Sequence, residues 1–353
     1  MNIITTILLF LGSYGNASDQ CIQVYTFDEN TGTAQYLTGC SGISNPSFIY
    51  PSKDGIHLFA VGEDEGDTSS ANSLLWNPLK PSLTLTGTRQ THGGAPCNII
   101  QSPSGKHVYT ANYLGGSITQ FQVLTDALLS EGKEIPFTGH SIDAQRQTRP
   151  YLHAVNFTPD SRFLLANDLG TDKIHVFPLI ADSDSLDTTQ AFDINIKPGT
   201  GPRHLCFSPN GRYAYLLGEL NGEITVIEYT PSSTTPFHIV QTILADEAEG
   251  HGSADIHISP DGLHLYASHR LQNDGISIFQ IADNGQLRKI GYQTTGIHPR
   301  NFAITPNGKY LLAACRDSNR VEIYQRNPST GLLIDTGHHI TMSQPVCVQF
   351  SSK

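Results

Sequence analysis

The amino-acid sequence predicts an all-β fold, a seven-bladed β-propeller with four-stranded antiparallel blades. Three observations lead to this prediction. Glycine (32 residues) and proline (20 residues) are scattered along all 353 positions, as is typical of short strands joined by tight turns. A turn containing proline recurs at a spacing of 46 to 56 residues. The two ends of the chain carry complementary parts of one further repeat.

Each repeat begins with two apolar strands around a tight turn. Six segments of this kind align without gaps, at residues 48–62, 99–113, 155–169, 205–219, 256–270 and 302–316. A third apolar strand follows in most repeats, at residues 117–123, 173–179, 223–229, 275–281 and 320–326. A fourth, polar strand then leads to the next repeat. A repeat of this length is typical of a propeller blade, and alternation of apolar and polar residues with a period of two excludes a helical solenoid.

The chain termini are predicted to share the seventh blade. Residues 344–353 read as the first strand of another repeat, and residues 7–15, 21–27 and 34–39 read as the three strands that it lacks. Pairing them closes the ring and removes exposed sheet edges. We therefore expect residues 7–15 to be a strand and not part of a signal peptide, since no Lys or Arg precedes this apolar run. Residues 1–353 are expected to form a single propeller domain.

Charge and cysteine content restrict the class of partner. The net charge of −11 argues against nucleic acid, and an anionic small molecule requires a local cluster of arginines. No apolar run reaches the roughly 20 residues of a membrane span, so no membrane partner is expected. Six separated cysteines without a CxxC motif read as free thiols in a reducing compartment, which predicts a cytoplasmic protein. The oligomeric state is left open.

Polar residues are predicted to ring one mouth of the propeller channel. The start of the first strand and the end of the second lie at the same end of each hairpin, and first strands line the channel of a propeller. At the starts of first strands stand Asn45, Cys97, His153, Arg203, His204, Asp255, Arg300 and Asn301. At the ends of second strands stand Glu63, Asn112, Asn167, Asp168, Glu219, Arg270 and Arg316.

Arginines at this mouth predict an anion site. Four of them gather there in an otherwise acidic chain, namely Arg203, Arg270, Arg300 and Arg316. For the amide and carboxylate residues two interpretations stay open. Asn112, Asn167 and Asp168 either bind the hydroxyl groups of a sugar or cap turns through their own backbone.

Several segments resemble the seven-bladed lactonase family over nearly the whole chain. The most specific are GPRHL at 201–205, NDLGTD at 167–172 and HPRNF at 298–302. The family contains the propeller-type 6-phosphogluconolactonase and the carboxy-cis,cis-muconate lactonizing enzyme. The resemblance implies an active site of His153, Arg203, Glu219 and Arg270, all of which are on the predicted mouth. In one departure from the family's His-x-His, Pro150 is followed by Tyr151-Leu152-His153.

Hydrolysis of a lactone needs a base that activates water and positive charge that stabilises the oxyanion, and it requires neither metal nor cofactor. Glu219 and His153 are the candidate bases, and we favour His153 with Glu219 orienting it. Arg203 and Arg270 would hold the developing charge. Arginine also suits a phosphate group, and the further candidates for it are Arg146, Arg149, Arg300 and Arg316. Substrate contacts are expected from Asn112, Arg149, Asn167, Asp168, His204, Arg300 and Arg316.

The resemblance therefore implies a lactone hydrolase whose substrate is a small anionic phosphosugar lactone, 6-phosphogluconolactone of the oxidative pentose phosphate pathway. Two alternatives remain. A cycloisomerase would use the same four residues to close a muconate to a lactone. A non-catalytic propeller would bind a partner protein and would tolerate changes at His153 and Glu219. Replacing Arg203 or Glu219 is expected to abolish hydrolysis and to leave thermal stability roughly unchanged.

Overall fold

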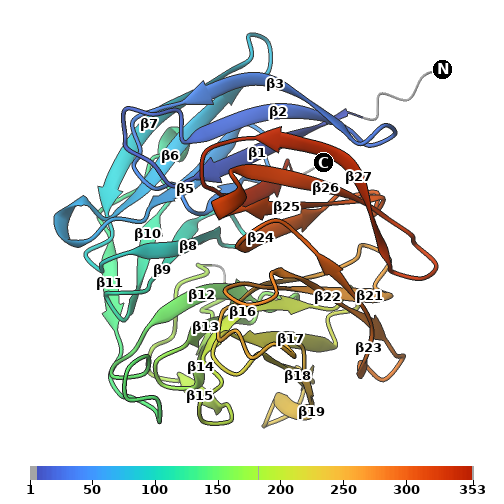
Figure 1. The fold of residues 1–353 in the computed structure, drawn as a ribbon. Coiled ribbons are helices and arrows are strands. Elements are labelled where there is room, and N and C mark those ends of the chain that lie inside the picture. The colour runs from blue at the N-terminus through green and yellow to red at the C-terminus, as the bar shows by residue number, and fades with distance from the viewer. Residues whose placement is uncertain (1–5, 182, 352–353) are drawn as a thin grey trace.

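The computed structural model describes residues 6–181 and 183–351, and these residues form an all-β ring of seven four-stranded antiparallel sheets. The sheets stand as blades around a common axis (Figure 1). Helical structure in the described residues is limited to three short 3-10 turns, η1 (Gly66–Thr68), η2 (Thr125–Ala127) and η3 (Arg316–Ser318). The predicted fold class is confirmed.

We number the blades from the N-terminus and name the strands of each from the axis outwards. Blade 1 consists of β28 (Pro345–Phe350), β1 (Thr6–Ser13), β2 (Ile22–Asp28) and β3 (Thr33–Cys40). Blade 2 consists of β4 (Ile49–Pro51), β5 (His57–Gly62), β6 (Ser70–Asn77) and β7 (Ser82–Gln90). Blade 3 consists of β8 (Pro96–Gln101), β9 (His107–Asn112), β10 (Ser117–Gln122) and β11 (Lys133–Pro136). Blade 4 consists of β12 (Leu152–Phe157), β13 (Phe163–Asp168), β14 (Lys173–Pro178) and β15 (Phe192–Asn195).

The remaining three blades follow the same order. Blade 5 consists of β16 (Pro202–Phe207), β17 (Tyr213–Gly218), β18 (Glu223–Tyr229) and β19 (Phe237–Leu244). Blade 6 consists of β20 (Ser253–Ile258), β21 (His264–His269), β22 (Gly275–Ile281) and β23 (Leu287–Thr294). Blade 7 consists of β24 (Pro299–Ile304), β25 (Tyr310–Cys315), β26 (Arg320–Arg326) and β27 (Leu333–Thr341).

Blade 1 closes the ring, as predicted. Its innermost strand β28 comes from the C-terminal segment and pairs antiparallel with β1, with Leu11 opposite Val348. The blue N-terminal and red C-terminal strands accordingly lie side by side in Figure 1. Residues 1–5, 352 and 353, which belong to the segments expected to share this blade or precede it, lie outside the described residues.

The innermost strands line the axis, and each contacts the innermost strand of the next blade around the ring. The hydrophobic core fills the spaces between neighbouring blades. Between blades 7 and 1, for example, Leu9 and Val348 pack in one cluster with Leu312 and Ile323. The start of every innermost strand is thereby fixed at one mouth of the channel.

The tight turns lie at the opposite end. In each, the N–H of the fourth residue donates to the carbonyl of a Ser or Thr, as from Gly55 to Ser52 and from Gly211 to Ser208. The fourth residue has positive φ, which favours glycine, and only Ser161 replaces it in this series. The first turn corrects our alignment by proline, because Pro51 lies in β4 and Lys53 occupies the position that proline has elsewhere.

Candidate active site

The predicted mouth contains one equivalent position on each blade, directly after the second strand. We call it the rim position. On six blades its backbone N–H donates to the carbonyl of a residue that precedes the first strand, over 3.1 Å from Tyr14 to Gln344 and 2.8 Å from Glu219 to Gly201. On blade 6 the side chain of Arg270 donates to the equivalent carbonyl, from Nε to Gly252 over 2.8 Å. From blade 1 to blade 7 the rim residues are Tyr14, Glu63, Tyr113, Leu169, Glu219, Arg270 and Arg316.

A second equivalent position lies in a β-bulge at the start of the first strand. The pairing register skips a residue there, as at His153 in β12 and Arg300 in β24. A bulge places an extra residue in one strand and re-aims its side chain, which turns these residues toward the mouth. In blades 1 and 3 to 7 the bulge residues are Val346, Cys97, His153, Arg203, Ala254 and Arg300.

Glu219 is the centre of the ionic cluster that these two positions create. Its Oε2 accepts a hydrogen bond of 2.9 Å from Nε of Arg203 and lies 3.4 Å from Nη2 of Arg270. Its Oε1 accepts a hydrogen bond of 2.6 Å from Nη2 of Arg146. Nε2 of His153 lies 3.7 Å from Oε2, which is longer than a direct hydrogen bond and lets both atoms face a single water molecule. The four residues that the family resemblance implied are thus brought together.

The cluster fixes the charge of its members. Burial alone would raise the pKa of Glu219, but Arg270, Arg203 and Arg146 outweigh it and lower that pKa to about 2. Burial lowers the pKa of His153 well below its usual value, and the positive charge of Arg203 adds to this effect. Burial also lowers the pKa of Arg270 to about 9. At neutral pH the site therefore holds an ionised Glu219, a neutral His153 and charged arginines.

A second ion pair lies across the mouth on blades 1, 2 and 7. The hydroxyl of Tyr14 donates to Glu63 over 3.2 Å, and Nη2 of Arg300 lies 3.6 Å from Oε1 of Glu63. The guanidinium of Arg300 also sits over the Tyr14 ring, 5.4 Å from its centroid. Because these contacts are long, the partly buried Arg300 has fewer short hydrogen bonds than the buried Arg203 and Arg270. Burial raises the pKa of Tyr14 to about 12, so its hydroxyl stays protonated.

The arginines of the mouth differ in how deeply they are buried, and they outnumber the carboxylates that they face. The Arg203 side chain is 2% exposed and Glu219 is 8% exposed, whereas Arg146 is 40% exposed. Arg203 thus lies at the bottom of the cluster and Arg146 at its solvent side. Four guanidinium groups, those of Arg146, Arg203, Arg270 and Arg300, face the two carboxylates of Glu63 and Glu219. This excess of positive charge in a chain of net charge −11 suits an anionic ligand.

His153 is held from three sides. The Cys97 sulfur lies 3.6 Å from its Nδ1 and 3.3 Å from its carbonyl oxygen. The rings of Tyr113 and His204 meet the imidazole edge-on, with centroids 5.3 Å and 5.4 Å away. If Nδ1 donates to the sulfur, Nε2 keeps its lone pair directed at the Glu219 side.

His204 lies beside an axial cavity of about 330 Å³. Its Nδ1 is 2.7 Å from Asp255, which also binds His257 over 2.9 Å. Burial lowers the pKa of His204 to about 4. His204 therefore supports His153 through the contact between their rings, and its predicted contact with a substrate stays a prediction. In the described residues, no three His, Cys, Asp or Glu side chains gather as metal ligands.

For three predicted sugar-binding residues, the turn-capping or structural role is the one observed. The Asn112 amide donates to Ser117 and Thr119 inside blade 3. Asn167 donates to the Arg203 carbonyl over 3.0 Å, and Asp168 accepts from the backbone of Tyr151 and Gly170. All three are fully buried. Asn112 and Asp168 lie one residue before the rim, and successive strand residues face opposite sides of a sheet, so their side chains point into the blades. Asn167 lies one residue further back and its amide is bound by the neighbouring blade.

Two further predicted arginines lie outside the cluster. Arg316 turns back to Asp317 with contacts of 2.7 Å and 3.1 Å. Arg149 is exposed and lies over the Tyr151 ring, 5.3 Å from its centroid. Arg146, which we had named only as a further phosphate candidate, contacts Glu219 directly.

The aromatic rim residues Tyr14 and Tyr113 were missed. The predicted mouth consists mainly of charged and amide side chains, and it includes no residue of blade 1. The signal was available, because each residue directly follows a second strand, as Glu219 does. Counting one residue past each second strand, in all seven repeats, would have found both.

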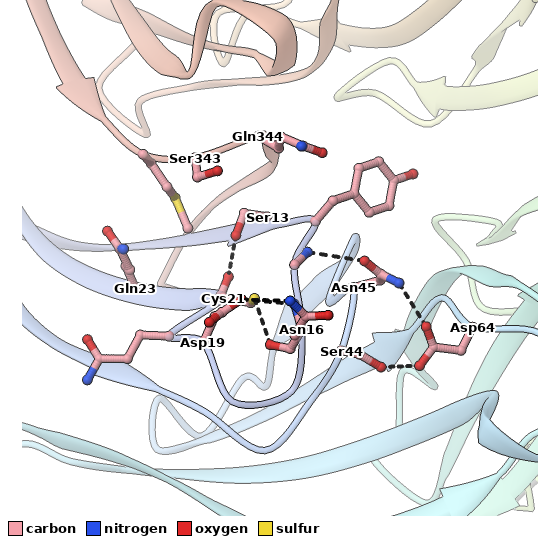
Figure 2. A pocket seen from close by; sticks show the side chains of 14 residues that line it. Ser13, Asn16, Asp19, Cys21, Gln23, Ser44, Asn45, Asp64, Ser343 and Gln344 are labelled. Atoms are coloured by element: carbon pink, nitrogen blue, oxygen red, sulfur yellow. Dashed lines mark hydrogen bonds between the residues drawn. The ribbon is translucent and has the colours of Figure 1, made fainter.

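A polar pocket of about 660 Å³ lies beside the cluster at the joint of blades 7, 1 and 2. Figure 2 shows its lining, in which Asn45 and Ser44 from one loop bind Asp64. Tyr14 lines this pocket and also binds Glu63, so it separates the pocket from the cationic cluster. The pocket's polar groups largely bind one another, and the candidate site is therefore the cluster and not this pocket.

The fold and the mouth together define a class of protein, a seven-bladed β-propeller with guanidinium, carboxylate and imidazole groups gathered at one end of its axis. The chain belongs to the seven-bladed β-propeller lactonase family, whose model matches residues 8–350. The family predicted from the sequence is thereby confirmed, and so is its class, an enzyme of the lactonase type.

Named relatives agree with this assignment. A 6-phosphogluconolactonase of Formosa agariphila is 35% identical over 332 residues, which cover 92% of this chain and 94% of the relative. A candidate 6-phosphogluconolactonase of Bacteroides fragilis has a similar crystal structure, with 42% identity, a TM-score of 0.93 and 99% of both chains covered. A periplasmic gluconolactonase of Pseudomonas aeruginosa superposes with a TM-score of 0.90 at 29% identity, covering 98% of this chain and 99% of that one.

Proposed function

We propose that the protein hydrolyses 6-phosphogluconolactone to 6-phosphogluconate. The observation that carries the proposal is the mouth cluster, in which a neutral His153 and an ionised Glu219 lie among four guanidinium groups. A base next to concentrated positive charge suits an ester that becomes an oxyanion and whose substituent is itself anionic. The names of the relatives support the same substrate.

In the proposed mechanism His153 and Glu219 flank the attacking water. Nε2 of His153 takes one proton while the water oxygen forms a bond to the lactone carbonyl carbon. Arg203, Arg270 and Arg300 provide the positive charge beside which the carbonyl oxygen becomes negative. The bond between the carbonyl carbon and the ring oxygen then breaks, and the proton on His153 passes to the leaving alkoxide. Glu219 stabilises the transient imidazolium and keeps the ring oriented.

The first test is hydrolysis itself. We expect purified protein to release acid from freshly prepared 6-phosphogluconolactone faster than the solution without enzyme, as followed by pH-stat. No muconate should lose its diene absorbance in the same preparation. A release of acid equal to the spontaneous rate would contradict the proposal.

The pH dependence is a second expected result. The pKa of His153 is well below 6.5 and that of Glu219 is about 2, so neither group gains a proton between about pH 8 and about pH 6. We expect kcat/KM, corrected for spontaneous hydrolysis, to be flat over this range and to fall only at lower pH. A titration with its midpoint at or above 6.5 would show that His153 is not the base or is not buried as observed.

We also propose a cytoplasmic location. All six cysteines are free thiols, and all but Cys206 are buried. Oxidising compartments favour disulfides, so this pattern supports a reducing one. In the described part of the chain, no helix has the length and apolar character needed to cross a membrane. Fractionation of the native cells tests the location, and recovery in the periplasm, where the Pseudomonas relative resides, would contradict it.

A further inference from the structure

Arg146 differs in origin from the other arginines around Glu219. Arg203 and Arg270 stand in or directly after blade strands, whereas Arg146 lies in the long loop 137–151 between β11 and β12. The backbone of this loop is anchored, because the fully buried Gln147 donates to the Leu169 carbonyl over 2.9 Å. The Arg146 N–H is also held, by Asp143 over 3.0 Å. The chain around Arg146 is therefore tethered to the propeller, and its partly exposed side chain reaches Glu219 from the solvent side.

Arg146 binds a different carboxylate oxygen of Glu219 from the one that Arg203 and Arg270 approach. Arg203 and Arg270 both approach Oε2, whereas Arg146 alone binds Oε1. Its other contact is a long one of 3.5 Å to the Tyr113 hydroxyl. Withdrawal of Arg146 would free one carboxylate oxygen completely and leave the position of Glu219 fixed by Arg203.

The ion pair between Arg146 and Glu219 is weak enough for a phosphate to replace the carboxylate as the partner of Arg146. The Arg146 side chain is 40% exposed, and solvent screening weakens the attraction of such a side chain to a single carboxylate. A phosphate monoester offers three acceptor oxygens and close to two negative charges, and it accepts hydrogen bonds from arginine in bidentate geometry. Arg203 cannot make the same exchange, because it is buried and also donates to the Ala254 carbonyl.

We infer that Arg146 is the phosphate sensor of the active site: the phosphate of the substrate takes its guanidinium from Glu219 and thereby releases the His153–Glu219 pair for proton abstraction. This inference rests on the proposed lactonase function. It makes Arg146 a residue that both binds the substrate and determines specificity for phosphorylated lactones.

The charge around Glu219 explains the activation. The charged and titratable groups that face it are Arg203 on β16, Arg270 after β21, Arg146 on the loop, His153 on β12 and Tyr113 after β9, with Arg300 on β24 and Cys97 on β8 further away. Removing one of three guanidinium groups leaves more of the negative charge of Glu219 uncompensated. A proton on the adjacent His153 is then stabilised, so the pair becomes a stronger base.

The experiment compares 6-phosphogluconolactone with glucono-lactone, which differs only in lacking the phosphate, in the wild-type protein and in Arg146→Gln. We expect Arg146→Gln to lower kcat/KM for the phosphorylated lactone by about 10- to 100-fold, the worth of lost charge-assisted hydrogen bonds. Activity on glucono-lactone should rise toward the phosphate-activated level of the wild-type protein, because the variant lacks the guanidinium that holds Glu219, and the acid limb of its pH profile should move to higher pH. Inorganic phosphate should activate the wild-type protein on glucono-lactone in a saturable way, relative to an enzyme-free blank, and should not activate the variant.

Arg212→Gln is the matched control, because it removes the same charge from an exposed pair with Glu228 near the turn end of blade 5. It should leave both lactones unaffected. Arg146→Lys keeps the charge without the bidentate geometry and should lose only part of the phosphate preference. An equal loss on both lactones in Arg146→Gln would overturn the inference, as would unchanged kinetics on the phosphorylated one.

Calorimetry separates this inference from the proposed function, because binding of the product needs no turnover. The wild-type protein should bind 6-phosphogluconate more tightly than gluconate, and Arg146→Gln should lose the difference. A protein that hydrolyses neither lactone would refute the proposed function, while the titration would still decide whether Arg146 captures phosphate. If the wild-type protein bound 6-phosphogluconate and gluconate with equal affinity, the inference that Arg146 senses phosphate would be overturned.

Discussion

Replacement of Glu219 by glutamine is expected to reduce lactone hydrolysis by about 10²- to 10⁴-fold and the free energy of unfolding by about 3–5 kcal/mol. The rate falls because His153 loses the negative charge that stabilises its protonated form. The stability falls because Arg203 and Arg270 stay buried with no carboxylate to neutralise them. Initial rates by pH-stat and urea unfolding measure the two effects.

The expected loss of unfolding free energy departs from the sequence-based expectation that thermal stability would be roughly unchanged. An unchanged stability would need a solvated mouth, whereas the Arg203 side chain is 2% exposed and lies at the bottom of the cluster. The control is Glu228→Gln, which breaks an exposed pair and should change the free energy of unfolding by no more than about 0.5 kcal/mol. A Glu219→Gln protein as stable as the control would contradict the argument.

The same group gives stability a pH dependence with a definite sign. The pKa of Glu219 is lowered from 4.5 to about 2 in the folded protein. Its contribution is therefore fully present above the unfolded value and is lost as the pH falls from about 4.5 to about 2. Urea midpoints of the wild-type protein should fall more steeply over this range than those of Glu219→Gln.

Replacement of Val348 by aspartate is expected to prevent the ring from closing, at a cost of about 4 kcal/mol or more. Val348 lies in β28, is fully buried and faces the core between blades 7 and 1. A carboxylate there has no cation nearby in this apolar cluster. The expected readout is loss of soluble protein or a strongly lowered urea midpoint.

Val348→Ala provides the graded comparison. It removes two methyl groups from the same core position without introducing a charge, so about 2 kcal/mol should be lost and the protein should stay soluble. If Val348→Asp were as soluble and as stable as the wild-type protein, β28 would not be the strand that closes the ring.

Much of the architecture was predictable because it depends on local chemistry repeated along the chain. The turn at Ser208–Gly211 and its equivalents specify a hairpin by a hydrogen bond and a positive φ, both of which are local. Strand β28 has no partner close to it in the sequence, and β1, β2 and β3 lack an innermost strand, so these two incomplete repeats were the signal for ring closure.

The candidate site was predictable only to within one residue. His153, Arg203, Glu219 and Arg270 were located, whereas Asn112 was chosen in place of its neighbour Tyr113. Strand ends assigned from sequence are uncertain by a residue or more, and a shift of one residue turns a side chain from the mouth into the blade.

The number of blades, the closure of the ring and the end of the channel that carries charged groups all follow from periodic patterns in the sequence and from the alternation of strands. Which arginines meet Glu219 depends on the folded chain. Arg146 reaches it from a loop 73 residues earlier in the chain, whereas Arg316 pairs with Asp317, the next residue. The reason is physical: ion pairing depends on distances of a few ångströms between side chains, and the conformation of one loop and the bulges of several strands set those distances.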